Sequence, residues 1–332
     1  MIEPSNHVRI VGITGGAGFI GSHLTRRLLQ AGCQVRVIDN LSMSDLSRLS
    51  DCRQHTRLTF HQIDVRDQSA LTKTLTGVDV IVHLAAFKIP RYGDALTTLL
   101  VNAQGAQNVF QIAAAQKIKV VFASTSDVYG KSADLPFHEE GNLTFGPSTV
   151  SRWTYAVSKL YTEQLAYAYH EAQELCFCGV RIFGCYGPGQ HLGWWGGPQG
   201  LFITAALLGK PMEIHGDGNQ TRTFLYIDDA VDGFVACINS REVTHQVINI
   251  GSVEEIAIVD LARLVHRLVV GTGEPPLSFV PYEQFGRYED VRRRVPNLQL
   301  AQQLIGFTPQ INLATGLSRT IEWQRAMKAR TG

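Results

Sequence analysis

The sequence predicts an α/β protein built on a Rossmann-type, doubly wound parallel sheet, with a smaller mixed α/β lobe on the C-terminal side. In the first half of the chain, short runs rich in β-branched residues alternate with helical patterns. This alternation is typical of a parallel sheet with helices on both faces. A glycine-rich turn, TGGAGFIG, joins the first such run to the first helical pattern. The 332 residues are enough for one large domain or for two lobes that share a cleft.

The elements follow from local patterns in chain order. Residues 8–14 (VRIVGIT) form a continuous apolar run that ends in glycines, as expected of a buried parallel strand. In the helical segment FIGSHLTRRLLQAG, apolar residues recur at Ile20, Leu24 and Leu28, and Gly32 ends the pattern. Further strands are predicted at QVRVID, LTFHQID, VDVIVHLAA, IKVVFAST and LCFCGVRIF. An amphipathic helix is predicted around residues 311–327.

The amino-acid composition of the sequence changes after Gly187. The stretch GPGQHLGWWGGPQG is rich in Gly, Pro and Trp and predicts a long loop, and long loops tend to be functional. We therefore divide the chain into a nucleotide-binding lobe, residues 1–187, and a substrate-binding lobe, residues 188–332, with a cleft between them. Some segments are expected to cross between the two lobes.

Composition excludes several classes of protein. Hydrophobic residues make up 45% and charged residues 18%, which is globular usage, and the net charge of +1 gives no reason to expect nucleic acid. No window is apolar enough for a membrane span, and the N-terminus does not resemble a signal peptide. Six cysteines lack metal-ligand spacing, so no metal is expected. Reduced thiols and a cytoplasmic location are expected.

The glycine turn and an acidic strand end together predict a dinucleotide site. Gly15, Gly18 and Gly21 allow a tight turn, close approach to a pyrophosphate, and close packing of helix on strand. Asp39 ends the second predicted strand, where a carboxylate accepts the ribose hydroxyls of NAD and repels the 2′-phosphate of NADP. The cofactor is therefore predicted to be NAD. Asp64, which ends the next strand, is either at the adenine edge or a helix cap.

A hydroxyl cluster and a Tyr–Lys pair predict a proton-transfer site. Tyr155 and Lys159 are four residues apart and so share one face of a helix. A phenol has a pKa of about 10, and a neighbouring ammonium together with a positive nicotinamide ring would lower it. Thr125 or Ser126, at a strand end, could hydrogen-bond the reacting oxygen of the substrate. A YxxxK pair alone is often a solvated helix face, but with the glycine turn it indicates catalysis.

These motifs resemble those of the extended short-chain dehydrogenase/reductase superfamily, in particular its nucleotide-sugar epimerases, dehydratases and decarboxylases. The matching pieces are TGGAGFIGSHL, VIDN, HLAAFK, STSDVYG, YAVSK, GCYGPG and GDGNQTRTFLYIDD, which span nearly the whole chain. The resemblance implies tightly bound NAD in the first lobe and an NDP-sugar, with UDP as the expected nucleotide, in the second. It also suggests a homodimer through helices around residues 94–116 and 151–170, although burial in the core of one chain explains their apolar faces equally well.

The resemblance implies the following site residues. The catalytic residues are Thr125, Tyr155 and Lys159. The residues that bind the cofactor are Gly15, Gly18, Phe19, Ile20, Gly21, Asp39, Asn40, Asp64, Val65, Leu84, Ala85, Ala86, Lys88, Tyr155 and Lys159. The residues that bind the substrate are Lys88, Asn102, Ser126, Asp127, Arg222, Arg287 and Arg294.

The reaction is expected to begin with oxidation of a sugar hydroxyl at C4, as in these relatives. Thr125 is followed by Ser-Asp rather than the Asp-Glu of 4,6-dehydratases. Lys88 resembles the lysine of UDP-galactose 4-epimerases, and 4-epimerisation of a UDP-hexose or UDP-hexuronate is therefore our first expectation. STSDVYG, RWTYAVSK and YEDVRRRVPN resemble UDP-glucuronate decarboxylases instead, which carry Ser-Glu after the threonine. A 4-keto-sugar reductase and a catalytically silent NAD sensor are further alternatives.

Three questions about the substrate site are not decided by the sequence. An epimerase-like alignment selects Arg287 as the second phosphate arginine, whereas a decarboxylase-like alignment selects Arg294. Gly184 stands where relatives usually carry an asparagine that helps to hold the NDP-sugar. The consecutive residues Trp194 and Trp195 either cover the cleft and stack on the ligand, or pack within a loop or a dimer contact.

Overall fold

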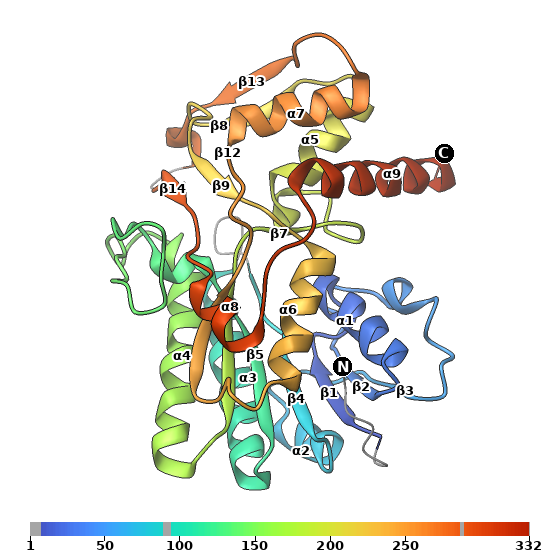
Figure 1. The fold of residues 1–332 in the computed structure, drawn as a ribbon, viewed down its shortest axis with the longest axis vertical. Coiled ribbons are helices and arrows are strands. Elements are labelled where there is room, and N and C mark those ends of the chain that lie inside the picture. Colours follow the sequence, from blue (N-terminus) through green and yellow to red (C-terminus); the bar gives the residue numbers. More distant parts are fainter. Residues whose placement is uncertain (1–7, 89–93, 286–288, 332) are drawn as a thin grey trace.

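A parallel sheet forms the centre of the larger lobe (Figure 1), as the sequence predicts, and it has seven strands where the sequence patterns indicate six. The computed structural model describes residues 8–88, 94–285 and 289–331. The strand order is β11-β6-β5-β4-β1-β2-β3, so the order reverses at β1 and creates a switch point there. The strands are β1 (Ile10–Thr14), β2 (Gln34–Ile38), β3 (Leu58–His61), β4 (Val80–His83), β5 (Lys119–Thr125), β6 (Phe177–Ile182) and β11 (Gln246–Ile250).

Helices cover both faces of this sheet because successive side chains of each strand point to opposite sides. Val80 and Val82 of β4 join the core that contains Leu24 of α1 and Phe234 of α6. Ile81, between them, joins the core on the other face with Phe110 of α3. The helices of this lobe are α1 (Phe19–Gln30), α2 (Gln68–Leu75), α3 (Ala95–Gln116), α4 (Trp153–Gln173) and α6 (Ile227–Asn239).

The smaller lobe is mixed α/β and lies above the larger one in Figure 1. Strand β8 (Met212–His215) pairs in parallel with β13 (Leu277–Val280). Strand β9 (Thr221–Thr223) pairs with antiparallel β12 (Glu255–Ala257) and with parallel β14 (Arg293–Arg294). Its other elements are β7 (Cys185–Tyr186), β10 (Leu225–Tyr226), α5 (Pro198–Leu207), α7 (Ile258–Val270), α9 (Leu313–Thr331), η3 (Trp194–Gly196) and η4 (Tyr282–Phe285). The 3-10 helices η1 (Leu46–Leu49) and η2 (Ser126–Tyr129) and the helix α8 (Gln299–Ile305) pack against the larger lobe.

The two lobes share one apolar core. The cluster beneath α1 and α6 continues through Tyr186 to Phe202 and Ile214 of the smaller lobe. Segments also cross the predicted boundary, since α6 and β11 follow residue 187 in sequence but belong to the larger lobe. The sequence analysis allowed for such crossing, and the boundary itself stays a prediction. Among the described residues, no helix is long and apolar enough to cross a membrane.

Candidate active site

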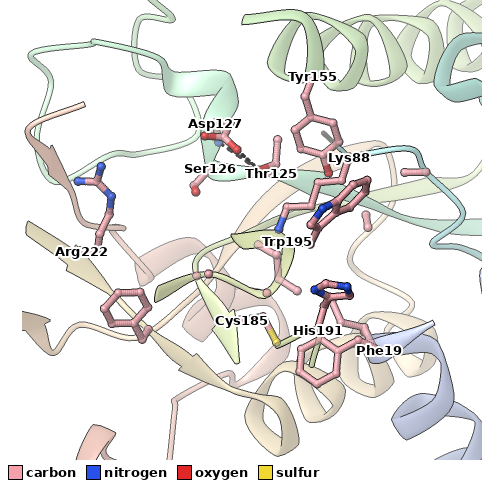
Figure 2. Close-up of a pocket in the computed structure, with 18 of the residues that line it drawn as sticks. Phe19, Lys88, Thr125, Ser126, Asp127, Tyr155, Cys185, His191, Trp195 and Arg222 are labelled. Carbon is pink, nitrogen blue, oxygen red and sulfur yellow. Dashed lines mark hydrogen bonds between the residues drawn. The ribbon is translucent and has the colours of Figure 1, made fainter. Parts of the chain in front are cut away.

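A cavity of about 500 Å³ opens between the carboxyl ends of the central strands and the smaller lobe (Figure 2). Parallel α/β sheets bind their ligands at this end, next to the switch point. The structure brings most of the predicted site residues to this cavity. They are Gly15, Gly18, Phe19, Ile20, Gly21, Leu84, Ala86, Lys88, Thr125, Ser126, Asp127, Tyr155, Lys159, Arg222 and Arg294.

The other predicted residues lie elsewhere. Those that do not line the cavity are Asp39, Asn40, Asp64, Val65, Ala85 and Asn102. Arg287 lies outside the described residues, so of the two competing arginines only Arg294 has a described position. No group of three or more potential metal ligands is found in the described part of the chain.

The glycine loop has the form that a pyrophosphate requires. Gly15 has a φ of +72°, and a Cβ on it would lie 2.6 Å from the backbone nitrogen of Ala85. A Cβ on Gly21 would collide with the carbonyl group of Gly15, so helix and strand pack this closely only with glycine. Gly18 caps α1 without a side-chain acceptor, which leaves the helix N-terminus open to an anionic group.

The Asp39 carboxylate is held in a fixed position at the end of β2. One oxygen accepts from Ala17 N at 3.1 Å, and the other accepts from Leu41 N and Ser44 Oγ, each at 2.9 Å. These contacts fix the carboxylate beside the glycine loop, where the dinucleotide-binding pattern places the adenosine ribose. The residues present therefore fit NAD.

Asp64 does not cap a helix. The N-cap of α2 is Asp67, whose side chain accepts from Ala70 N, so that reading of Asp64 is wrong. Hydrogen bonds from Arg66 hold the pKa of the Asp64 carboxyl well below its ordinary value despite partial burial, and Asn40 also donates to it. The alternative role of Asp64, at the adenine edge, stays a prediction.

Tyr155 and Lys159 lie on one face of α4 in the cavity wall, where Lys159 is buried and Tyr155 is partly buried. The Lys159 ammonium lies 6.0 Å from the Tyr155 ring centroid, and its Nζ donates to Ala123 O at 2.7 Å. Burial lowers the pKa of Lys159 to about 8, opposed by the nearby Glu163 charge. Burial raises the pKa of Tyr155 well above its ordinary value, and Asp127 raises it further.

Both causes raise the pKa of the phenol, whereas the sequence analysis expects an ammonium and a positive nicotinamide ring to lower it. That expectation includes the charge of bound NAD and stays a prediction.

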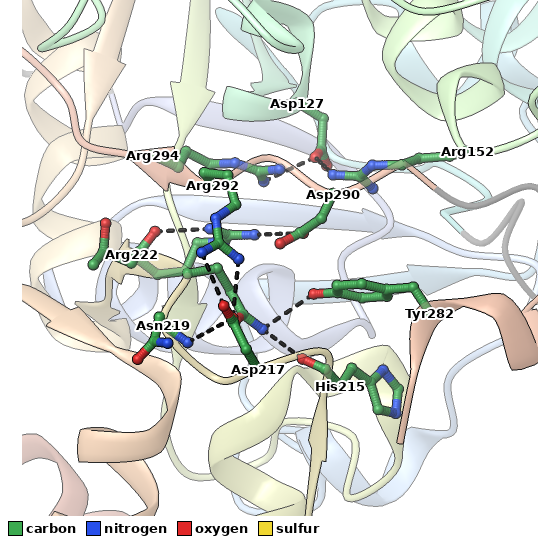
Figure 3. A network of polar contacts seen from close by, with 12 residues as sticks. Asp127, Arg152, His215, Asp217, Asn219, Arg222, Tyr282, Asp290, Arg292 and Arg294 are labelled. Carbon is green, nitrogen blue, oxygen red and sulfur yellow. Dashed lines mark hydrogen bonds and ion pairs between the residues drawn. The ribbon is translucent and has the colours of Figure 1, made fainter. Parts of the chain in front are cut away.

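Two guanidinium groups hold Asp127 next to Thr125. Figure 3 shows them on opposite sides of the carboxylate: Arg294 Nη1 lies 2.8 Å and Arg152 Nη2 lies 3.8 Å from Asp127 Oδ1. Burial raises the pKa of Asp127, but Arg294, Arg152, Lys88 and Arg222 together hold it well below its ordinary value. The carboxylate is therefore ionised, and it accepts from Thr125 Oγ1 at 3.3 Å.

Asn102 is a buried connector between the loop after β4 and helix α4. Its side chain accepts from Phe87 N at 2.8 Å and donates to Phe87 O and to Ser158 Oγ. Ser158 Oγ in turn donates to Tyr155 O at 2.7 Å. This amide is fully occupied by the protein and lies outside the cavity lining, which favours a positioning role over the predicted contact with substrate.

Arg222 lies in the cavity wall of the smaller lobe, where a guanidinium can bind a diphosphate. Its Nη2 contacts Asp290 Oδ1 at 3.2 Å, and Asp290 also lines the cavity. Sequence reasoning gave Arg152 no role, although its place at the N-terminus of α4, three residues before Tyr155, was a usable signal. It also did not single out His191 and Gln220, although both lie in segments it named, or His215 and Tyr282, to which no motif points.

The fold and this constellation define an NAD-dependent enzyme of the short-chain dehydrogenase/reductase type. Residues 11–251 match the model of the NAD dependent epimerase/dehydratase family, and the chain belongs to that family.

Its relatives include both decarboxylases and epimerases. It is 34% identical to the UDP-N-acetyl-alpha-D-glucosaminuronate decarboxylase of Bacillus cytotoxicus, over 95% of this chain and 98% of the relative. It is 35% identical to UDP-glucuronic acid decarboxylase 1 of Xenopus tropicalis, over 94% of this chain and 71% of the relative. A solved UDP-glucuronic acid 4-epimerase from Bacillus cereus, in complex with UDP-glucuronic acid and NAD, superposes with a TM-score of 0.86 at 27% identity, over 96% and 99% of the two chains.

Proposed function

We propose that the protein is an NAD-dependent decarboxylase of a UDP-linked hexuronate. The observation that carries the proposal is the ion pair of Asp127 with Arg294, at 2.8 Å, in the wall of the cavity that holds Thr125, Tyr155 and Lys159. The similarity to decarboxylases over most of the chain supports the same choice. Epimerisation, our first expectation from sequence, becomes the second candidate.

The chain's own residues explain the first half of the reaction. NAD supplies a reversible two-electron oxidation of the sugar at C4. Tyr155 accepts the proton of the C4 hydroxyl, the Thr125 hydroxyl hydrogen-bonds the same oxygen, and Lys159 contributes positive charge beside the phenol. The product of this step is a 4-keto sugar whose C6 carboxylate lies β to the ketone.

A β-keto acid loses CO2 because the ketone can accept the electron pair that the departing carbon leaves behind. The C5–C6 bond breaks, its electron pair moves to C5 and O4, and a proton then adds to C5, so one carboxylate and one proton are replaced by CO2 and a C–H bond. The hydroxyl groups of Thr125 and Tyr155 stabilise the negative O4 by hydrogen bonding. Reduction at C4 completes the cycle and restores the cofactor.

The Asp127–Arg294 pair is suited to the decarboxylation step. Arg294 offers a uronate carboxylate a positive partner, whereas ionised Asp127 opposes a second negative charge. That opposition ends when neutral CO2 departs. Because Asp127 is ionised, it cannot supply the proton for C5. Its role in the proposal is to orient Arg294 and the Thr125 hydroxyl, to which it is hydrogen-bonded.

Epimerisation remains a second candidate because Lys88 lines the same cavity, and it resembles the lysine of UDP-galactose 4-epimerases. An epimerase would return the hydrogen to the opposite face of C4 before CO2 is lost. Both candidates use the same first step, so only the product distinguishes them. A homodimer through α3 and α4 and a cytoplasmic location also stay predictions.

Product analysis tests the proposal. The purified protein is incubated, without added cofactor, with UDP-glucuronate, UDP-N-acetylglucosaminuronate and UDP-glucose. The products are separated by chromatography, and their masses are measured by mass spectrometry. Loss of CO2 from either uronate supports the proposal. A new isomer of unchanged mass would replace it with epimerisation. Turnover only of a 4-keto sugar with added reduced cofactor would indicate a reductase. Tyr155→Phe, which lacks the base, serves as the inactive control.

A further inference from the structure

The loop that follows β7 folds back on itself and presents the Trp195 side chain to the cavity. A Cβ on Gly196 would collide with the carbonyl group of His191, so this close return of the chain requires glycine. Trp195, His191 and Gly197 line the cavity, whereas Leu192 is exposed and lies outside the lining. The His191 ring lies against the Trp195 indole, with centroids 6.1 Å apart.

A series of contacts that leads to helix α4 supports Trp195. The Phe87 ring meets the Trp195 indole edge to face, with centroids 6.2 Å apart. Asn102 holds the backbone of Phe87 at both its N–H and its C=O groups, and it also contacts Ser158 on α4. An unbroken set of contacts therefore connects the Trp195 indole to the turn of α4 that carries Tyr155.

Trp195, Lys88 and Tyr155 all line the cavity (Figure 2). Lys88 directly follows Phe87, and its charge acts on Asp127. Through Phe87, the indole is therefore connected to the residues that carry the proposed reaction.

We propose that Trp195, supported by Phe87, is a specificity-determining residue that contacts the hexose of the nucleotide sugar and shields its reacting carbon from water. The indole covers the apolar C–H surface of a pyranose, which removes that surface from water. Exclusion of water also strengthens the hydrogen bonds that Thr125 and Tyr155 make with the sugar. The inference rests on the proposed use of a nucleotide sugar, but not on whether the sugar is decarboxylated or epimerised.

Binding measurements separate the hexose from the rest of the ligand. The dissociation constants of UDP, UDP-glucose and UDP-glucuronate are measured by calorimetry for the wild-type protein and for Trp195→Ala. We expect the variant to bind both UDP-sugars about tenfold more weakly and UDP equally well, since an aromatic contact and its buried area are worth roughly this factor. Trp195→Phe, which keeps an aromatic ring, should recover most of the loss.

The controls distinguish contact with the hexose from other roles. Leu192→Ala, in the same loop but outside the cavity lining, should bind all three ligands like the wild type. The proposal would be overturned if Trp195→Ala lost affinity for UDP and for the UDP-sugars equally, or lost affinity for none of them. A lower NAD content in Trp195→Ala would also overturn it. If the wild type binds UDP-glucose but converts neither uronate, the proposed decarboxylase activity fails while the role of Trp195 is still tested.

Discussion

Arg181 on β6 and Glu163 on α4 form a buried ion pair on the side of the helix that carries Lys159. Arg181 Nη2 lies 2.7 Å from Glu163 Oε2, and Arg181 Nε lies 3.0 Å from Glu163 Oε1. Ser124 on β5 also donates to Glu163. Glu163 follows Lys159 by one helical turn, so this pair joins the catalytic helix to two strands whose ends form the site.

Removing one member of this pair should destabilise the fold. Arg181→Met leaves the Glu163 carboxylate buried without its partner, and breaking a buried pair lowers the free energy of unfolding by about 3–5 kcal/mol. Chemical denaturation measures the change. Arg263→Ala, which removes an exposed pair with Asp260, should cost at most about 1 kcal/mol. Equal effects of the two variants would contradict the role of the buried pair.

Tyr155→Phe should abolish turnover and leave NAD bound. The substitution removes only the hydroxyl that accepts the C4 proton, while the partly buried ring that packs in the cavity wall remains. Turnover and the amount of NAD that remains after purification are both measured. Normal turnover would remove Tyr155 from the catalytic role, and loss of NAD would show that its main role is in cofactor binding.

Lys159→Met should stabilise the fold at neutral pH while abolishing activity. Burial lowers the pKa of Lys159 from 10.5 to about 8. Between these values the unfolded chain holds a proton that the folded chain has lost, so stability rises with pH in this window. Below pH 8 the full penalty of burying the charge is present, about 3 kcal/mol.

The test of this effect is its dependence on pH. Thermal unfolding of the wild type and of Lys159→Met is compared from neutral to alkaline pH. The variant should be the more stable protein below pH 8, and its advantage should shrink as the pH rises toward 10.5. An advantage that does not vary with pH would mean that packing, not charge, separates the two proteins.

Arg294→Met should impair turnover of a uronate by about a hundredfold or more while UDP still binds. The substitution removes the positive partner proposed for the substrate carboxylate. Of the two arginines that form ion pairs with Asp127, only Arg152 then remains. Arg293→Ala is the matched control, because the neighbouring guanidinium pairs with Glu255 and does not line the cavity. Steady-state rates and calorimetric binding of UDP check the expectation.

Asp39→Ala should reduce the amount of NAD retained by the purified protein. The carboxylate fixed at the end of β2 is the proposed acceptor for the ribose hydroxyls. Ser44→Ala removes one hydrogen bond to the same carboxylate and should have a smaller effect. Cofactor content is measured after denaturation. Unchanged content in Asp39→Ala would limit Asp39 to the turn that its contacts with Ala17 and Leu41 stabilise.

The features that could be predicted from sequence are local ones. The glycine turn and the Tyr155–Lys159 pair each lie within one short segment, so their spacing determines their geometry. The alternation of strands and helices likewise predicted the parallel sheet, because each crossover places the next strand parallel to the last.

The features that could not be predicted depend on segments far apart in the chain. Arg152 lies at the N-terminus of α4, Asp127 in η2 and Arg294 in β14, and no spacing along the chain places these three side chains together. The edge-to-face contact of Phe87 with Trp195 also joins two distant segments. The burial that raises the pKa of Tyr155 is likewise a property of the assembled cavity, which no local pattern reveals.

The place of β11 in the sheet has a consequence for synthesis of the chain on the ribosome. Strand β6 pairs with β5 on one side and with β11 on the other, and β11 is made only after the loop, α5 and α6 that separate it from β6. Until then, the nascent sheet presents the backbone of β6 as an open edge, which invites pairing with other chains. Because the sheet is completed late, folding depends on contacts between segments far apart in the sequence. The nascent chain is therefore exposed to aggregation for longer.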